Sequence, residues 1–118
     1  MSRLTDAWFY GTIPQEKGKM TEQTMIGEIV KATRKRIPVG HYRVLLFGSR
    51  AEGRAREGSD YDIAIDSNEI IPFVAWAKLE ADLEDLPTLA KVDLVDLRTA
   101  SPAIAKSART KGKVIYER

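Results

Sequence analysis

The fold is decided by the stretch Leu46-Phe47-Gly48-Ser49, which is followed after ten residues by Asp60-Tyr61-Asp62-Ile63. The apolar residues 44–47, which end at the glycine, are typical of a buried strand. The residues that begin at Asp60 predict a second strand over positions 60–66. A short basic connection joins the two strands, so we expect them to lie antiparallel.

Asp60 and Asp62 present two carboxylates to one face of the second strand, because residues i and i+2 of a strand point the same way. Their backbones lie roughly 7 Å apart by the strand rise. Two carboxylates this close repel each other unless a cation lies between them. Proteins commonly hold Mg²⁺ with one or two carboxylates together with substrate phosphates. The pair therefore predicts a metal site.

Gly48 and Ser49 supply the turn that follows the first strand. Glycine permits a positive φ and lets a ligand approach the backbone closely. The pattern Ser49-x-x-Glu52 is that of a capping box, which predicts a short helix beginning at Ser49. Free backbone N–H groups at a helix N-terminus bind phosphate. Each of these features is common by itself, but together with the Asp-x-Asp pair they predict a nucleoside triphosphate site.

A third acid, Asp93, lies within an apolar strand predicted over residues 91–97. Strand alternation gives this segment two faces, one with Asp93, Val95 and Leu97 and the other with Val92, Leu94 and Asp96. An acid inside an apolar strand is costly unless it is paired or binds metal. Asp93 is therefore the best candidate for a third carboxylate, whereas Asp96 is nearer the strand end and can reach solvent.

Helical periodicity predicts three helices around these strands. The first covers residues 21–36, and its basic last turns are interpreted as a solvated helix end. The second covers residues 70–86, begins near Pro72, and carries an apolar stripe interpreted as core: Phe73, Trp76, Leu79, Leu83 and Leu86. Ser101 caps a third helix over residues 103–111, which Gly112 ends. Residues 114–116 form a last short strand, so the element order is that of an α+β domain.

The motif Gly-Ser-x10-Asp-x-Asp resembles the signature of the nucleotidyltransferase superfamily with the DNA polymerase β-like fold. Residues 46–53 and 59–64 look like the minimal nucleotidyltransferases (MNT), small proteins paired with HEPN proteins in bacteria and archaea. The resemblance runs from about Thr21 to the C-terminus, so residues 21–118 are predicted to be the nucleotidyltransferase domain. Residues 1–20 are then an N-terminal extension, with Met20 as an alternative start. The implied fold is a small mixed β-sheet with helices mainly on one face.

The resemblance also implies an activity, a Mg²⁺-dependent transfer of AMP from ATP to a hydroxyl acceptor. Asp60, Asp62 and Asp93 would be the catalytic acids and would hold two Mg²⁺ ions, since family members carry their third acid at the position of Asp93. Gly48, Ser49 and Arg50 would bind the nucleotide. For Arg50, a phosphate contact and an ordinary loop role remain equally open.

Composition sets further bounds. The 118 residues suggest one domain, and they contain no cysteine and no apolar run of ~18 residues. We therefore expect no membrane span and a cytoplasmic protein. The net charge of +2, from 19 basic and 17 acidic side chains, is too balanced to indicate nucleic acid as a direct ligand. His41, the only histidine, has no partner for a zinc site.

We expect the acceptor surface to come from another molecule, because an acceptor pocket needs walls and no predicted loop exceeds a dozen residues. Candidate docking surfaces are the aromatic cluster Trp8-Phe9-Tyr10 and the tail around Tyr116. The MNT resemblance implies a HEPN toxin as partner, with AMP transferred to its tyrosine hydroxyl in an antitoxin role. The alternative is a non-catalytic antitoxin subunit that neutralises a HEPN ribonuclease by binding. Drug-modifying nucleotidyltransferases fit less well, since they carry an extra helical domain.

Overall fold

The computed structural model describes residues 20–118, so the predictions for Trp8-Phe9-Tyr10 and the rest of the N-terminal extension lie outside the described residues. The elements are α2 (Glu22–Arg36), β1 (Tyr42–Phe47), the 3₁₀ turn η1 (Gly48–Arg50), β2 (Tyr61–Ser67), α3 (Phe73–Glu84), β3 (Val92–Asp96), α4 (Pro102–Lys111) and β4 (Lys113–Glu117). This order confirms the α+β prediction. Within the described residues, the helices are too short or too polar to cross a membrane.

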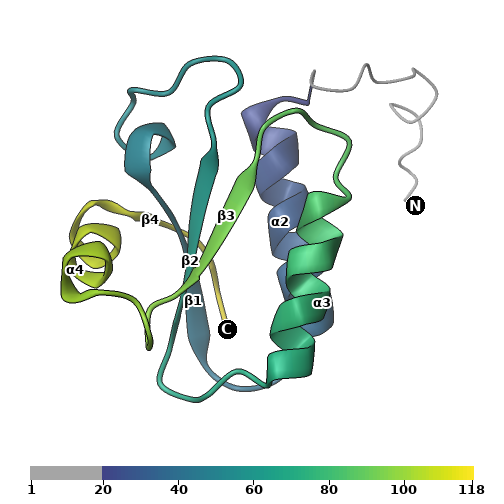
Figure 1. Ribbon diagram of the computed structural model, residues 1–118, viewed down its shortest axis with the longest axis vertical. Coiled ribbons are helices and arrows are strands. Elements are labelled where there is room, and N and C mark those ends of the chain that lie inside the picture. Colours follow the sequence, from purple (N-terminus) through teal and green to yellow (C-terminus); the bar gives the residue numbers. More distant parts are fainter. Residues whose placement is uncertain (1–19) are drawn as a thin grey trace.

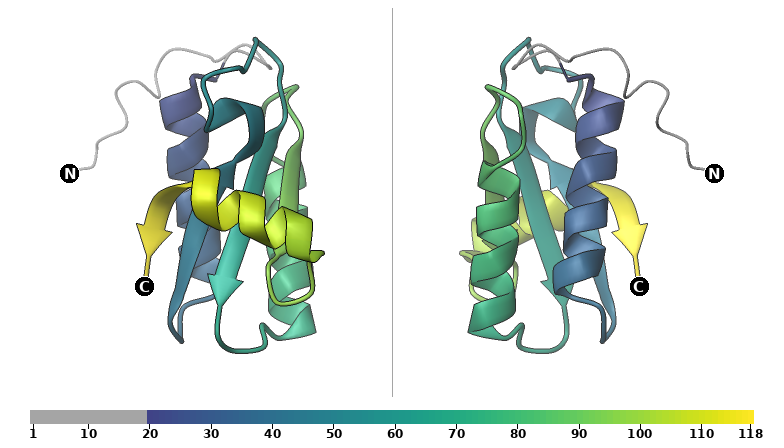
Figure 2. Two further views of the ribbon diagram at one scale, coloured as in Figure 1. Left: turned by 90° about the vertical axis from the view of Figure 1, so that its left-hand side faces the viewer. Right: turned by 90° about the vertical axis from the view of Figure 1, so that its right-hand side faces the viewer.

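The four strands form one sheet in the order β3-β2-β1-β4. β1 runs antiparallel to β2 and β4, whereas β2 and β3 are parallel, which confirms the mixed sheet. Figure 1 looks at the sheet from its β3 edge, with α2 and α3 on one side and α4 on the other. Figure 2 shows α4 crossing the face that α2 and α3 leave open. The helices therefore lie mainly, but not all, on one face.

Side-chain alternation divides the core into two layers. One face of β1 and β2 carries branched apolar side chains that pack under α2 and α3, and this main cluster includes Met25, Ile29, Val44, Leu46, Ile63, Ile65, Leu79 and Leu83. The other face packs against α4 through small side chains, in a cluster of Leu45, Ala64, Leu97, Ala105 and Ala108. Because Ala64, Ala105 and Ala108 are small, α4 can approach the sheet closely. Each large side chain buried in the main cluster contributes about 1.5–3 kcal/mol.

Two sets of ion pairs hold the helices in place, one between α2 and α3 and the other between α4 and the sheet. Arg36 of α2 donates two hydrogen bonds to Asp82 of α3, of 2.6 and 3.0 Å. On the other face, Asp66 of β2 accepts hydrogen bonds from Arg43 at 2.8 Å and from Arg109 of α4 at 3.1 Å. Burial raises the pKa of Asp66, but these bonds and the two positive charges outweigh it and hold the pKa below its usual value. Asp66 therefore anchors α4 to the sheet.

The apolar stripe predicted for α3 is correct except at its first residue. Leu79 and Leu83 are buried, and Trp76 and Leu86 pack partly against the main cluster. Phe73 is 81% exposed, so its assignment to the core was wrong. At 3.6 residues per turn, Phe73 points about 90° away from the mean direction of Trp76, Leu79 and Leu83. The side chain that opens α3 therefore faces out of the core.

Candidate active site

Asp62 and Asp93 lie side by side on neighbouring strands. β2 and β3 pair in parallel with Asp62 opposite Asp93, and β1 pairs with β2 so that Phe47 lies opposite Asp62. Paired residues of adjacent strands project to the same face of a sheet. This face is the one on which α4 packs, and α4 contacts it through Leu45 and Ala64 further along β1 and β2. The predicted register of the third strand is therefore correct, and Asp93 joins Asp62.

Asp60 lies just before the strand rather than within it. β2 begins at Tyr61, one residue later than predicted, and Asp60 is exposed at the end of the loop before it. The backbone N–H of Tyr61 donates to the carbonyl of Lys91 at 2.8 Å, which ties this loop end to the start of β3. Asp60 therefore lies near enough to Asp62 for its charge to act on that carboxylate.

Gly48 forms the wall opposite Asp62. Its φ of +74° lies in the left-handed region that favours glycine. A Cβ added at Gly48 would collide with the Asp62 carboxylate, so the backbone approaches this side chain more closely than any other residue type allows. The Gly-Ser turn and the Asp-x-Asp motif, ten residues apart, are thereby brought into contact.

The predicted helix cap at Ser49 is wrong. η1 begins at Gly48, with Phe47 in the capping position, and no side chain among the described residues caps it. Because Ser49 already lies inside the turn, its hydroxyl cannot accept from the N–H groups that a capping residue would serve. Glu52 does not complete a capping box either, since its carboxylate pairs with Arg54 at 3.4 Å. A phosphate contact of Ser49 remains a prediction.

Arg50 fastens the loop that leads to Asp60. Its Nε and Nη2 donate to the carbonyl of Ser59 at 3.0 and 2.7 Å, and its Nη1 pairs with Glu22 at 3.1 Å. The guanidinium also stacks on the ring of Tyr61, 3.8 Å from the centroid. Its side chain is only 10% exposed. Arg50 thus holds both neighbours of Asp60, and its predicted nucleotide contact remains untested.

Burial and neighbouring negative charge make ionisation of the Asp62 carboxyl less favourable. The pKa of Asp62 lies above its ordinary value because the side chain is partly buried and because the charges of Asp93 and Asp60 repel its ionised form. Lys91 offsets part of this repulsion through an exposed ion pair with Asp93 of 3.4 Å. Within residues 20–118, no three or more His, Cys, Asp or Glu side chains are grouped so that they could hold a metal ion by themselves.

These carboxylates still fit a magnesium ion that takes part of its coordination from a substrate. Mg²⁺ is usually held by one or two carboxylates together with phosphate oxygens and water. Asp62 and Asp93 supply two such groups, and their mutual repulsion favours a cation between them. Binding of two Mg²⁺ ions by Asp60, Asp62 and Asp93 remains a prediction.

A cleft of about 460 Å³ opens beside Asp62 and Asp93, between β3 and the helices α3 and α4. It is lined by both carboxylates and also by Phe47, Glu80, Leu83, Glu84, Lys91, Val92, Leu94, Val95 and Ile104. The sequence interpretation did not assign Lys91 or Phe47 to the site. Lys91 could have been found, because it precedes Asp93 by two residues and shares its face. Phe47 could have been found as the residue just before the Gly-Ser turn.

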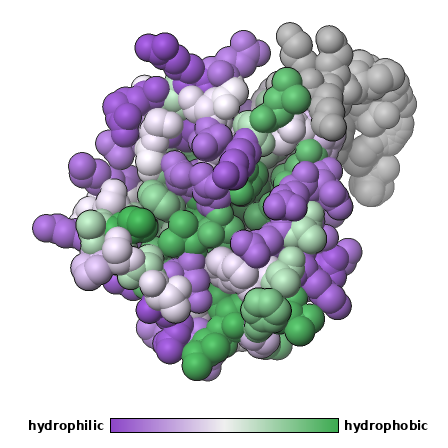
Figure 3. Space-filling view, viewed as in Figure 1, coloured by the Kyte–Doolittle hydropathy of each residue, from purple (hydrophilic) through white to green (hydrophobic). Residues whose placement is uncertain are grey.

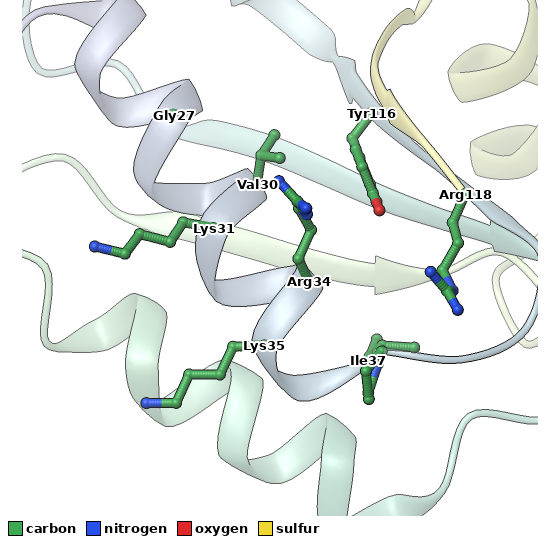
Figure 4. A pocket seen from close by; sticks show the side chains of 9 residues that line it. Gly27, Val30, Lys31, Arg34, Lys35, Ile37, Tyr116 and Arg118 are labelled. Carbon is green, nitrogen blue, oxygen red and sulfur yellow. The ribbon is translucent and has the colours of Figure 1, made fainter. Parts of the chain in front are cut away.

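A second cavity, of about 490 Å³, lies between α2 and β4 and is strongly basic. Figure 4 shows Arg34 directed towards Tyr116, with Arg118 nearby, and the Arg34 guanidinium lies 5.7 Å from the Tyr116 ring centroid. Tyr116 also packs on Tyr42, with ring centroids 6.0 Å apart. Tyr116 is therefore partly buried. The predicted docking surface around it can include only the exposed part of its side chain. Lys31, Arg34 and Lys35 line this cavity, at the far edge of the sheet from Asp93.

The fold and the paired carboxylates beside a Gly-Ser turn define a nucleotidyltransferase domain. The sequence matches the polymerase beta nucleotidyltransferase family over residues 39–118, and the chain belongs to that family. Protein adenylyltransferase MntA of Shewanella oneidensis is 33% identical over 95 residues, which cover 80% of this chain and 67% of that protein. A Haemophilus influenzae protein also named MntA is 36% identical over 80 residues, which cover 68% of this chain and 70% of that one.

Solved structures agree with these relatives. A toxin–antitoxin crystal structure with AMP-PNP matches with a TM-score of 0.65 and 31% identity, over 79% of this chain and 73% of that one. A complex of the tri-AMPylated Shewanella oneidensis HEPN toxin with its MNT antitoxin matches with a TM-score of 0.62 and 29% identity, over 83% and 74% of the two chains. The resemblance to minimal nucleotidyltransferases is confirmed.

Proposed function

We propose that this chain transfers AMP from ATP to a tyrosine hydroxyl of a HEPN toxin and so acts as the antitoxin of a pair. The observation that carries the proposal is the in-register pairing of Asp62 with Asp93 against the Gly48 turn. The relatives support the choice of substrate and acceptor, since they are named protein adenylyltransferases and a similar antitoxin was solved with an AMPylated HEPN toxin.

Asp60, Asp62 and Asp93 would hold Mg²⁺, which when bound neutralises phosphate charge and stabilises the attacking and leaving oxygens. The turn at Gly48 and Ser49 would receive the phosphates, because its backbone approaches the Asp62 carboxylate closely enough to bring phosphate and carboxylate together. Arg50 would act indirectly, as a positioning residue that fixes Ser59 and hence Asp60.

In the transfer step the acceptor oxygen attacks the α-phosphorus of ATP and forms a new P–O bond. The bond from that phosphorus to the β-phosphate bridging oxygen breaks, and pyrophosphate leaves with both electrons. Asp93 would accept the hydroxyl proton; its position at the sheet edge beside the cleft and its 41% exposed side chain support this role. A positioned carboxylate acting as general base contributes roughly 10²–10⁴-fold to the rate.

Incubation of the purified protein with ATP, Mg²⁺ and the HEPN toxin encoded beside it tests the proposal directly. Intact mass spectrometry should show one or more AMP units added to the toxin, and peptide mapping should place them on tyrosine. The variant Asp62→Asn should give no mass gain. Stable binding with loss of ribonuclease activity and no mass gain would overturn the catalytic proposal in favour of the binding-only antitoxin.

A further inference from the structure

The outer edge of β3 carries the features of a strand-docking site. β3 is the terminal strand of the sheet and has no second strand partner within residues 20–118. The hydrogen bonds from Tyr61 N–H to the Lys91 carbonyl and from Leu97 N–H to the Ile65 carbonyl show that the odd-numbered residues of β3 face β2. In a parallel ladder, alternate residues direct both backbone groups to opposite sides. Val92 and Leu94 therefore direct their N–H and C=O groups outwards.

Two clefts run along this edge and meet. The cleft beside Asp62 and Asp93 includes Leu94 and Val95 in its lining. A second cleft, also of about 460 Å³, is lined by Leu94 and Val95 together with Ile71, Phe73, Trp76, Asp96, Thr99 and Ala100. The two form a continuous groove along β3, with carboxylates at one end and aromatic side chains at the other.

The aromatic end of the groove is unusually apolar for an exposed surface. Phe73, which lines this end, is 81% exposed, and Ile70 and Val74, close to it in the sequence, are 78% and 61% exposed. Figure 3, which looks at this edge of the sheet, shows hydrophobic side chains gathered between α4 and α3 within a largely hydrophilic surround. Apolar side chains that gather on an exposed surface mark interaction sites more often than scattered ones do.

We propose that the acceptor protein docks on this edge with an extended segment that adds a fifth strand to the sheet beside β3. This inference rests on the proposed function, because the occupant is the segment that carries the hydroxyl to be adenylylated. The groove is continuous with the carboxylates, and Asp93 itself belongs to the edge strand, so an acceptor bound at Asp93 is necessarily next to β3. Backbone hydrogen bonds to Val92 and Leu94 would give affinity, and side-chain contacts would give specificity.

The geometry also defines a sequence requirement for that segment. Asp93 faces the α4 side of the sheet, whereas Trp76 packs with the residues of the α3 side. Successive side chains of a strand alternate between faces, so the hydroxyl and an apolar side chain that meets Phe73 and Trp76 must be an odd number of residues apart. From Asp93 to the level of Asp96 is a rise of roughly 10 Å, or three residues. The acceptor therefore carries an apolar residue three positions from its tyrosine.

Leu94→Pro tests the strand pairing, with Leu94→Ala as its matched control. Both variants lose the partly buried leucine side chain, but only proline removes the outward N–H, and proline is tolerated at a strand edge. With the HEPN toxin of the neighbouring gene as probe, Leu94→Pro should raise the KM for toxin at least tenfold above that of Leu94→Ala. Thermal melts and ATP titrations of the two variants should agree. Equal KM values for two folded variants would overturn strand addition and leave the proposed function intact.

Amide hydrogen exchange gives a readout that does not depend on either variant. Bound toxin should slow exchange of the Val92 and Leu94 amides at least tenfold, whereas Asp93 and Val95, already bonded to β2, should change little. Phe73→Ala should also raise the KM for toxin several-fold, whereas Val39→Ala, another exposed apolar residue that lies outside both clefts, should not. Unchanged exchange at Val92 and Leu94 in a toxin complex that transfers AMP would contradict the inference. A toxin that neither binds nor gains AMP would overturn the proposed function and this inference with it.

Discussion

Asp62→Asn should stabilise the protein in the absence of metal and nucleotide. Neighbouring strands lie ~4.8 Å apart, and two unit charges at that distance repel by about 3 kcal/mol at an effective dielectric constant of ~20. The Asp93 side chain is 41% exposed, so solvent screening reduces this to about 1 kcal/mol. Removing the Asp62 charge should therefore raise the melting temperature by about 3–5 °C at pH 7 for a chain of this length.

The pH dependence of this gain follows from the direction of the pKa shift. Asp62 has a pKa above its ordinary value of 3.8, so its ionisation is less favourable in the folded state than in the unfolded state. The penalty is absent below 3.8, where both states are protonated, and grows as the pH rises through the folded pKa. The stabilisation by Asp62→Asn should accordingly be full at pH 7 and vanish at pH 3.

Asp66→Asn is the matched control, since Asp66 lies on the same strand and face but pairs with Arg43 and Arg109. Its pKa is lowered, so it stabilises the folded protein above 3.8 and loses that contribution as the pH falls through the folded pKa. Asp66→Asn should lower stability by about 1–2 kcal/mol at pH 7. Thermal melts in EDTA measure both variants. If Asp62→Asn destabilises as much as Asp66→Asn does, the carboxylates of the site do not repel and our electrostatic account is refuted.

Other substitutions separate the roles of the remaining site residues. Asp93→Ala should retain ATP binding but lose AMP transfer by 10² or more, as measured by single-turnover assays with toxin, and a larger loss in Asp96→Ala would contradict the assignment. Gly48→Ala should weaken Mg²⁺-dependent ATP binding at least tenfold in calorimetry, because its Cβ would displace the Asp62 carboxylate. Ser49→Ala should leave the free energy of unfolding within about 0.5 kcal/mol, since Ser49 caps no helix, yet weaken ATP binding; unchanged ATP affinity would remove Ser49 from the site. Arg50→Ala should lower the free energy of unfolding by about 1–3 kcal/mol in denaturant through loss of the Ser59 and Glu22 contacts, whereas a neutral result would contradict the role of Arg50 in holding the loop before Asp60.

The parts of the site that sequence predicts well are those whose chemistry is local. The glycine at position 48 and the acids at 60 and 62 are fixed by turn geometry and by residue type, so their spacing is informative without coordinates. Asp93 is recognisable because an acid is costly in an apolar strand. Its position opposite Asp62 agrees with the predicted register of that strand, whereas its role as a third carboxylate stays a prediction.

The sequence-based predictions are wrong or incomplete where several local patterns compete, or where a contact between residues far apart in the sequence determines the position of a side chain. Ser49 satisfies the capping pattern, but the turn starts one residue earlier because Gly48 takes the positive φ. Phe73 has helical spacing from Trp76, but it points about 90° away from the mean direction of Trp76, Leu79 and Leu83. The contacts of Arg50 with Glu22, and of Asp66 with Arg109, join residues far apart in sequence and leave no periodic signal.

We propose that the paired carboxylates beside the Gly48 turn form a metal-dependent nucleotide site, and calorimetric titration of ATP tests this proposal directly. We expect ATP to bind in the presence of Mg²⁺ and this binding to be lost in EDTA. Asp62→Asn should lose at least tenfold in affinity, about 1.4 kcal/mol, while Asp66→Asn, further along the same strand, should bind as the unmodified protein does. Equal ATP affinity for the unmodified protein and Asp62→Asn, both with Mg²⁺ present, would contradict the site and every mechanistic step built on it.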